Sequence, residues 1–95
     1  MGKEEMGIGV NVERVFHTDS DGVRVRVSTG EIVSVPGFEI GKNVTVMGLN
    51  STESDWIITS ITRNSEGEIW VNVKKEGNEY DNKSMSLATL KKLNQ

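Results

Sequence analysis

The 95-residue chain contains no cysteine, a single histidine and a single proline. The lack of cysteine excludes a disulfide framework and a thiolate metal site, and His17 alone cannot form a multi-histidine zinc site. No apolar run is long enough to span a membrane, and the charged segment 3–5 lacks the apolar core of a signal peptide. We therefore expect a cytoplasmic protein without a metal, a cofactor or membrane contact.

An excess of basic charge is also missing. The net charge of −3 gives no overall electrostatic footprint for nucleic acid, although a local basic face can still exist. A chain of this length buries only about 60–65% of its unfolded surface, so its core is thin and leaves little room for a deep cavity. We expect one domain, or one domain with an extra hairpin, and the sequence leaves its oligomeric state open.

β-Branched residues dominate the apolar content. There are twelve valines and seven isoleucines but only four leucines, which favours strands over helices. The alternation at 23–27 predicts a strand with one apolar and one cationic face, and Pro36 followed by Gly37 stops the next strand. The predicted fold class is all-β, with a flexible arm at 1–7, an N-terminal β-meander at 8–36 and a second unit at 37–95.

Two stretches of the chain resemble each other at an offset of 46 residues. The matching apolar positions are Val10, Val12, Val15, Val23, Val25 and Val27 in the first stretch and Trp56, Ile58, Ile61, Ile69, Val71 and Val73 in the second. A polar turn divides each stretch, as in a β-hairpin. The match records either a duplication or the general likeness of two hairpins. In both stretches the apolar spacing changes from two to three, which predicts a β-bulge near Glu13–Arg14 and near Thr59–Ser60.

The second unit has a strand pattern over 38–46, a polar loop over 50–55 and two tight hairpins after it. Its end carries three leucines at threefold spacing behind a candidate N-cap: Ser86, Leu87, Leu90 and Leu93. This pattern predicts one or two helical turns packed against the sheet, or a 3₁₀ turn that leads into a last short strand.

This order of elements resembles an SH3-like small β-barrel of the Tudor or KOW type. The resemblance depends on Phe38-x-x-Gly41-x-x-Val44-x-Val46, the long polar first loop, the two hairpins and a short helical turn before a final strand, over about residues 37–95. It implies that residues 8–35 form an added meander that packs on the barrel. The other interpretation is a single barrel of six or seven strands built from both repeats.

Catalytic and metal-binding patterns are weak. The segment 19–22 looks like a fragment of a calcium loop, but an EF-hand register would place His17 at the first ligand position and Ser28 at the twelfth, where glutamate is expected. Aspartate and glycine are also ordinary residues of hairpin turns. His17, Asp19 and Ser20 lie too close together on one turn to provide a buried, oriented base. We therefore expect no catalytic residues, and we do not expect an enzyme.

The candidate binding residues are the aromatic and basic side chains of the predicted strands: Trp56, Trp70, Tyr80, Arg24, Arg26, Lys74 and Lys75. Trp70 interrupts an alternating strand, so it faces outward, either as a binding platform or under a cover. Cover by the meander is our expectation. Tudor-like folds bind methylated cations in aromatic cages, but too few aromatic residues are present to carry that function over.

A non-catalytic interaction module that docks on a protein partner is the function that the sequence favours. Its small size, mixed charge and lack of a cofactor motif suit an adaptor or inhibitor of the kind that phages and mobile elements encode. The alternative is a KOW-like nucleic-acid-binding module, in which arginine and lysine contact phosphates. A third interpretation is an assembly component with an exposed strand edge that pairs between subunits.

Overall fold

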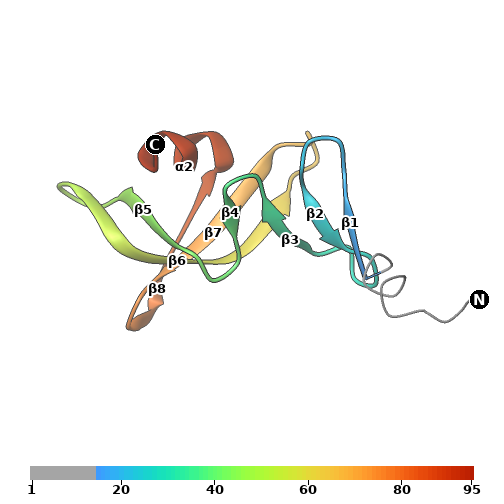
Figure 1. Cartoon of the computed structure of the whole chain (residues 1–95). Helices are drawn as coiled ribbons and strands as arrows, with labels where there is room; N and C mark the ends of the chain where they lie inside the picture. The colour runs from blue at the N-terminus through green and yellow to red at the C-terminus, as the bar shows by residue number, and fades with distance from the viewer. Residues whose placement is uncertain (1–14) are drawn as a thin grey trace, which may run out of the picture.

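The computed structural model describes residues 15–95 as one antiparallel sheet followed by a short helix (Figure 1). The strands are β1 (Phe16–Thr18), β2 (Arg24–Arg26), β3 (Ile32–Val35), β4 (Phe38–Glu39), β5 (Asn43–Met47), β6 (Thr52–Arg63), β7 (Ile69–Lys75) and β8 (Asn78–Ser86). Their order in the sheet is β1-β2-β3-β6-β7-β8, while β4 pairs with β3 and β5 pairs with β6. The prediction of a predominantly β chain is confirmed. Among the described strands the sheet is not closed, because β1 and β8 lie at its opposite ends.

The N-terminal meander is present as β1, β2 and β3, which pair antiparallel in sequence order. It is joined to the rest of the sheet by β3, which pairs with β4 and, at Ile32, with Ile61 of β6. The predicted arm at 1–7 and the predicted bulge near Glu13–Arg14 lie outside the described residues.

The strand expected over 38–46 is broken in the structure, which corrects the prediction. β4 ends at Glu39 and β5 begins at Asn43. Gly41 adopts a φ of +93°, and the N–H of Lys42 donates to the carbonyl of Glu39 (3.1 Å). The sequence pattern does not reveal this turn, because apolar residues alternate on both sides of it and only Gly41 indicates it.

The long hairpin of β6 and β7 provides five of the eleven core residues of the described chain. A register shift between Ile58 and Ser60 confirms the predicted bulge near Thr59–Ser60. The extra residue brings both Ile58 and Ile61 to the buried side, which a regular strand with a two-residue period cannot do at this spacing. Val71 and Val73 of β7 face them and are fully buried.

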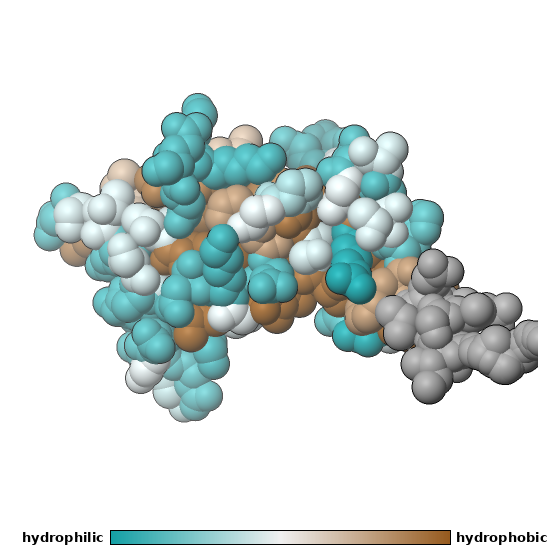
Figure 2. All heavy atoms as spheres, in the orientation of Figure 1, coloured by the Kyte–Doolittle hydropathy of each residue, from teal (hydrophilic) through white to brown (hydrophobic). Residues whose placement is uncertain are grey.

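The chain ends in helix α2 (Leu87–Leu93), which replaces the alternative of a 3₁₀ turn and a last strand. The hydroxyl of Ser86 accepts a hydrogen bond from the N–H of Thr89 at 3.2 Å, as its predicted role of N-cap requires. Leu90 is fully buried and attaches the helix to the core, while Leu87 and Leu93 are half-buried. Figure 2 shows apolar atoms in the middle of the sheet, with polar side chains around them.

Candidate binding site

A hollow of about 440 Å³ lies over the meander, and we call it the meander hollow. It is lined by Phe16, Arg24, Arg26, Glu31, Val33, Ser34, Glu39, Ile40 and Thr59. These residues come from β1, β2, β3, β4 and the bulge of β6, together with the segments that follow β2 and β4. The site therefore forms where the meander meets the long hairpin of β6 and β7.

An aromatic ring between two arginines forms one wall of the meander hollow. Phe16 of β1 pairs with Arg26 of β2 in the sheet register. The guanidinium carbon of Arg24 lies 4.4 Å from the centre of the Phe16 ring, and that of Arg26 lies 5.1 Å from it. The two arginines share a face because they are two residues apart on a strand. Cation–π attraction holds the ring and both cations in a defined arrangement.

The hollow also carries negative charge and an exposed apolar side chain. Nε of Arg26 lies 3.7 Å from Oε1 of Glu31, and Glu39 lines the same space. Ile40 is 38% exposed. The wall thus offers both signs of charge, an aromatic ring and an aliphatic group to a ligand.

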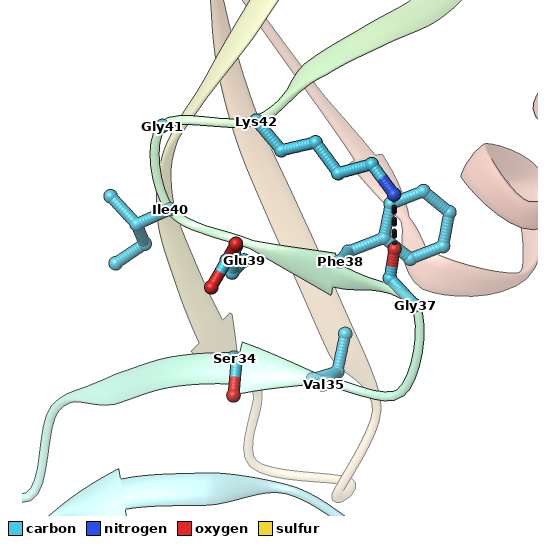
Figure 3. A pocket seen from close by; sticks show the side chains of 8 residues that line it. All are labelled: Ser34, Val35, Gly37, Phe38, Glu39, Ile40, Gly41 and Lys42. Atoms are coloured by element: carbon cyan, nitrogen blue, oxygen red, sulfur yellow. Dashed lines mark hydrogen bonds between the residues drawn. The ribbon is translucent and has the colours of Figure 1, made fainter.

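A second hollow of about 590 Å³ adjoins the first and shares Ser34, Glu39 and Ile40 with it. Figure 3 shows the segment 37–42 curving around it, with Ile40 directed away from Phe38. Nζ of Lys42 donates to the carbonyl of Gly37 (2.6 Å) and lies 5.1 Å from the centre of the Phe38 ring. A second cation–aromatic pair therefore lines this second hollow.

Trp56, a predicted binding residue, is buried at 3% exposure, so it offers no surface to a partner. Its indole N–H donates to Oε1 of Glu53 (2.9 Å), and Nζ of Lys83 lies 5.4 Å from its ring. The hydrogen bond from Trp56, together with the charge of Lys75, lowers the pKa of the Glu53 carboxyl. Because its strand is apolar on both faces, the sequence pattern does not distinguish a core tryptophan from a surface one.

Trp70 and Tyr80 are on the surface, but the structure does not bring them together. Trp70 is 36% exposed and Tyr80 is 88% exposed. The register pairs Trp70 with Ser86, whereas Tyr80 lies near the other end of β8. Trp70 keeps 36% of its surface exposed, so its expected burial under the meander is not confirmed.

The predicted basic residues fall into two separate groups. Arg24 and Arg26 line the meander hollow. Lys74 and Lys75 lie at the end of β7, where Lys75 pairs with Trp56 in the register and its Nζ is 3.7 Å from Oε1 of Glu53. A single basic face made of all four side chains does not form.

Phe16, Glu31, Glu39 and Ile40 belong to the candidate site but were not predicted from the sequence. The alternation of valine and arginine over 23–27 did predict the shared face of the two arginines. The partner of that face depends on the register between β1 and β2, which the turn at 19–22 sets. The only sequence signal for this register is the set of turn-forming residues at 19–22.

The calcium-like segment is a hairpin turn in the structure. Oδ1 of Asp19 accepts hydrogen bonds from the N–H groups of Asp21 (2.9 Å) and Val23 (3.0 Å). Within residues 15–95 no three histidine, aspartate or glutamate side chains gather as metal ligands do. Over the same residues, no helix has the length and apolar character needed to cross a membrane.

Comparisons of the chain with protein-family models, with curated proteins and with solved structures give no match.

Proposed function

We propose that this protein is a non-catalytic binding module that docks on a protein partner through the meander hollow. The observation that supports the proposal is the Phe16 ring held by two guanidinium groups in a hollow that also contains Glu31 and Glu39. Such a module would act as an adaptor or as an inhibitor of its partner.

The mixed charge of the hollow favours a protein partner over nucleic acid. Phosphate groups carry one sign of charge, and their affinity grows with the number of cations that meet them. Here Arg26 already lies beside Glu31, and Glu39 would repel a phosphate. A protein surface can offer a cation to the glutamates and an anion to the arginines, so both signs would be used.

The arrangement also meets the requirements of an interface hot spot. Aromatic residues and arginine are enriched among residues that carry most of the binding energy. The contacts around Phe16 restrict its motion and that of Arg24 before binding, which reduces the entropy lost on association. The exposed side chain of Ile40 adds apolar area beside them.

Affinity capture with the tagged chain, with and without nuclease, tests the proposal. We expect a defined protein to be retained after nuclease treatment and at moderate salt. Phe16→Ala and Arg24→Glu should both remove it, while Tyr80→Ala, a change at the remote end of β8, should leave it bound. Capture that requires nucleic acid and decreases steeply with salt would support the nucleic-acid alternative instead.

The finer fold assignment is part of the same proposal. We propose that the segment 37–95 is an open variant of an SH3-like small barrel, in which α2 follows β8 in place of a last strand. The order of β5, β6, β7, β8 and α2 supports this assignment. A cytoplasmic location and the absence of catalytic activity remain predictions.

A further inference from the structure

The sheet face opposite the core at β7 carries Trp70, Asn72 and Lys74, and we call it the outer face. Val71 and Val73 alternate with these residues and are fully buried, so the side chains between them lie on the other side of the sheet. Helix α2 packs on the core side, where its buried leucine joins the two valines (Figure 1). On the outer face Trp70 is 36% exposed, so its ring is open to a ligand.

Two rows of uncharged side chains cross the outer face at Trp70 and Asn72. Residues directly opposite each other in an antiparallel sheet direct their side chains to the same face. The neighbours are Thr62 and Ser86 beside the tryptophan, and Ser60 and Ser84 beside the asparagine. Along the chain the first charged residues before and after the two positions on β7 are Glu68 and Lys74. The two rows therefore place hydroxyl and amide groups around an aromatic ring, without charge.

Hydrogen bonds hold the row of Asn72 in a fixed arrangement. Nδ2 of Asn72 donates to Oγ of Ser60 (2.8 Å), and Oγ of Ser84 donates to Oδ1 of Asn72. A carboxamide nitrogen carries two hydrogens, and a hydroxyl both donates and accepts, so these two bonds leave donors and acceptors for a ligand. Because the three side chains are ordered before binding, a ligand loses less entropy on association with them.

A hollow of about 320 Å³ lies beside Trp70 on the outer face. It is lined by Asn72, Val73, Asn82, Lys83 and Ser84. Residues two apart on a strand are separated by about 7 Å, so the Trp70 ring and the side chain of Asn72 are neighbouring contact points. An extended ligand that crosses β7 and β8 would meet the aromatic ring first and the polar hollow next to it.

We propose that the outer face binds a neutral oligosaccharide, with Trp70 stacked on one sugar ring and the row of Asn72 bonded to the hydroxyls of the next. A sugar ring has an apolar face of C–H groups, which suits an aromatic plane. Its hydroxyls both donate and accept, as the hydroxyl and amide groups of the row do. A phosphate-bearing ligand would need cations, which the two rows lack. The proposal does not depend on the meander hollow, whose lining includes neither Trp70 nor Asn72.

Affinity electrophoresis tests the proposal in gels that contain hydroxyethyl cellulose, laminarin, galactomannan, arabinoxylan or soluble starch. We expect at least one of these neutral polysaccharides to retard the wild-type chain, equally at low and high salt. Trp70→Ala should weaken that binding about tenfold, because the apolar ring surface is no longer covered. The matched control is Tyr80→Ala, which removes an 88% exposed aromatic residue near the other end of β8 and should leave binding unchanged. Retardation by none of the five polysaccharides overturns the proposal.

A second variant keeps the test decisive if Trp70→Ala does not fold. Ser84→Ala removes one exposed hydroxyl from the row of Asn72 and should weaken retardation by the same polysaccharide. Trp56 is buried, so a change in tryptophan fluorescence on adding that polysaccharide should report on Trp70. Unchanged binding in either variant overturns the proposal. Retardation by a single-stranded oligonucleotide instead, decreasing steeply with salt, also overturns it, because the face would then stack bases.

Discussion

The turns of the two main hairpins, β1–β2 and β6–β7, have the same structure. Asp19 and Asn64 each accept backbone N–H groups two and four residues ahead through Oδ1. In each turn the backbone N–H of the same residue bonds the carbonyl four residues on, and a glycine three residues on donates back to it. Gly22 and Gly67 have φ of +84° and +86°. Both turns are thus three-residue hairpin loops with a left-handed glycine.

These equivalent turns are offset by 45 residues, whereas the apolar positions match at 46. In the structure Gly22 corresponds to Gly67, and the buried Val23 corresponds to the exposed Glu68. A shift of one residue moves a strand's side chains to the other face. The ungapped match therefore does not align structurally equivalent residues, which favours the general likeness of hairpins over a duplication.

The strands beside the turns differ far more than the turns do. β1 and β2 have three residues each, while β6 has twelve and β7 has seven. The long hairpin contains five of the core residues: Trp56, Ile58, Ile61, Val71 and Val73. An ion pair joins the two turns, because the Arg63 guanidinium at the end of β6 lies 3.4 Å from Oδ2 of Asp19. Local hydrogen bonds determine the conformation of each turn. The apolar area that the flanking strands bury determines how much each hairpin contributes to the stability of the fold.

The same substitution in each hairpin should give the largest contrast. Val71→Ala removes a fully buried side chain from the long hairpin, and we expect it to lower the free energy of unfolding by about 2–3 kcal/mol. Val25→Ala acts on a half-buried side chain of the short hairpin and should cost about 1 kcal/mol. Urea titrations followed by tryptophan fluorescence measure both values. Equal losses would mean that the short hairpin contributes as much to the core as the long one.

The two turn glycines provide a smaller and sharper contrast. Both have positive φ, so alanine at either position costs about 1–2 kcal/mol of backbone strain. A Cβ at Gly22 would lie 2.8 Å from Cγ of Pro36, whereas a Cβ at Gly67 would have no neighbour within 4 Å. Gly22→Ala should therefore be more destabilising than Gly67→Ala in the same urea titration. Identical effects would show that the contact with Pro36 relaxes at no cost.

Local sequence signals predicted the local parts of this fold. The change in apolar spacing located the bulge at Ile58–Ser60, and the position of Ser86 before the leucines located the helix start. Properties that depend on distant pairing were not predictable. The burial of Trp56 depends on which face of an all-apolar strand meets the core, and the stacking of Phe16 depends on the register of β1 with β2.

The smallest expected effect concerns the pH response of the two turns. The backbone N–H of Val23, then that of Asp21, and the Arg63 side chain lower the pKa of Asp19 from its ordinary value of 3.8. Because the pKa is lower in the folded chain, the stabilisation is present above that ordinary value and is lost as the pH falls through the folded-state pKa. Asn64, in the same role, does not titrate.

Asp19→Asn should accordingly make the first turn resemble the second. We expect the difference in unfolding free energy between wild type and this variant to be constant at neutral pH and to change only in the acidic range, where Asp19 becomes protonated. Urea titrations at a series of pH values measure that difference. The reciprocal change, Asn64→Asp, should add a smaller acid-sensitive contribution to the second turn. The two N–H donors to Oδ1 are present there, but the new carboxylate would face Glu68, to whose Oε1 the Asn64 side chain donates at 3.0 Å. If Asp19→Asn leaves the pH profile unchanged, the hydrogen bonds of this carboxylate do not contribute to stability.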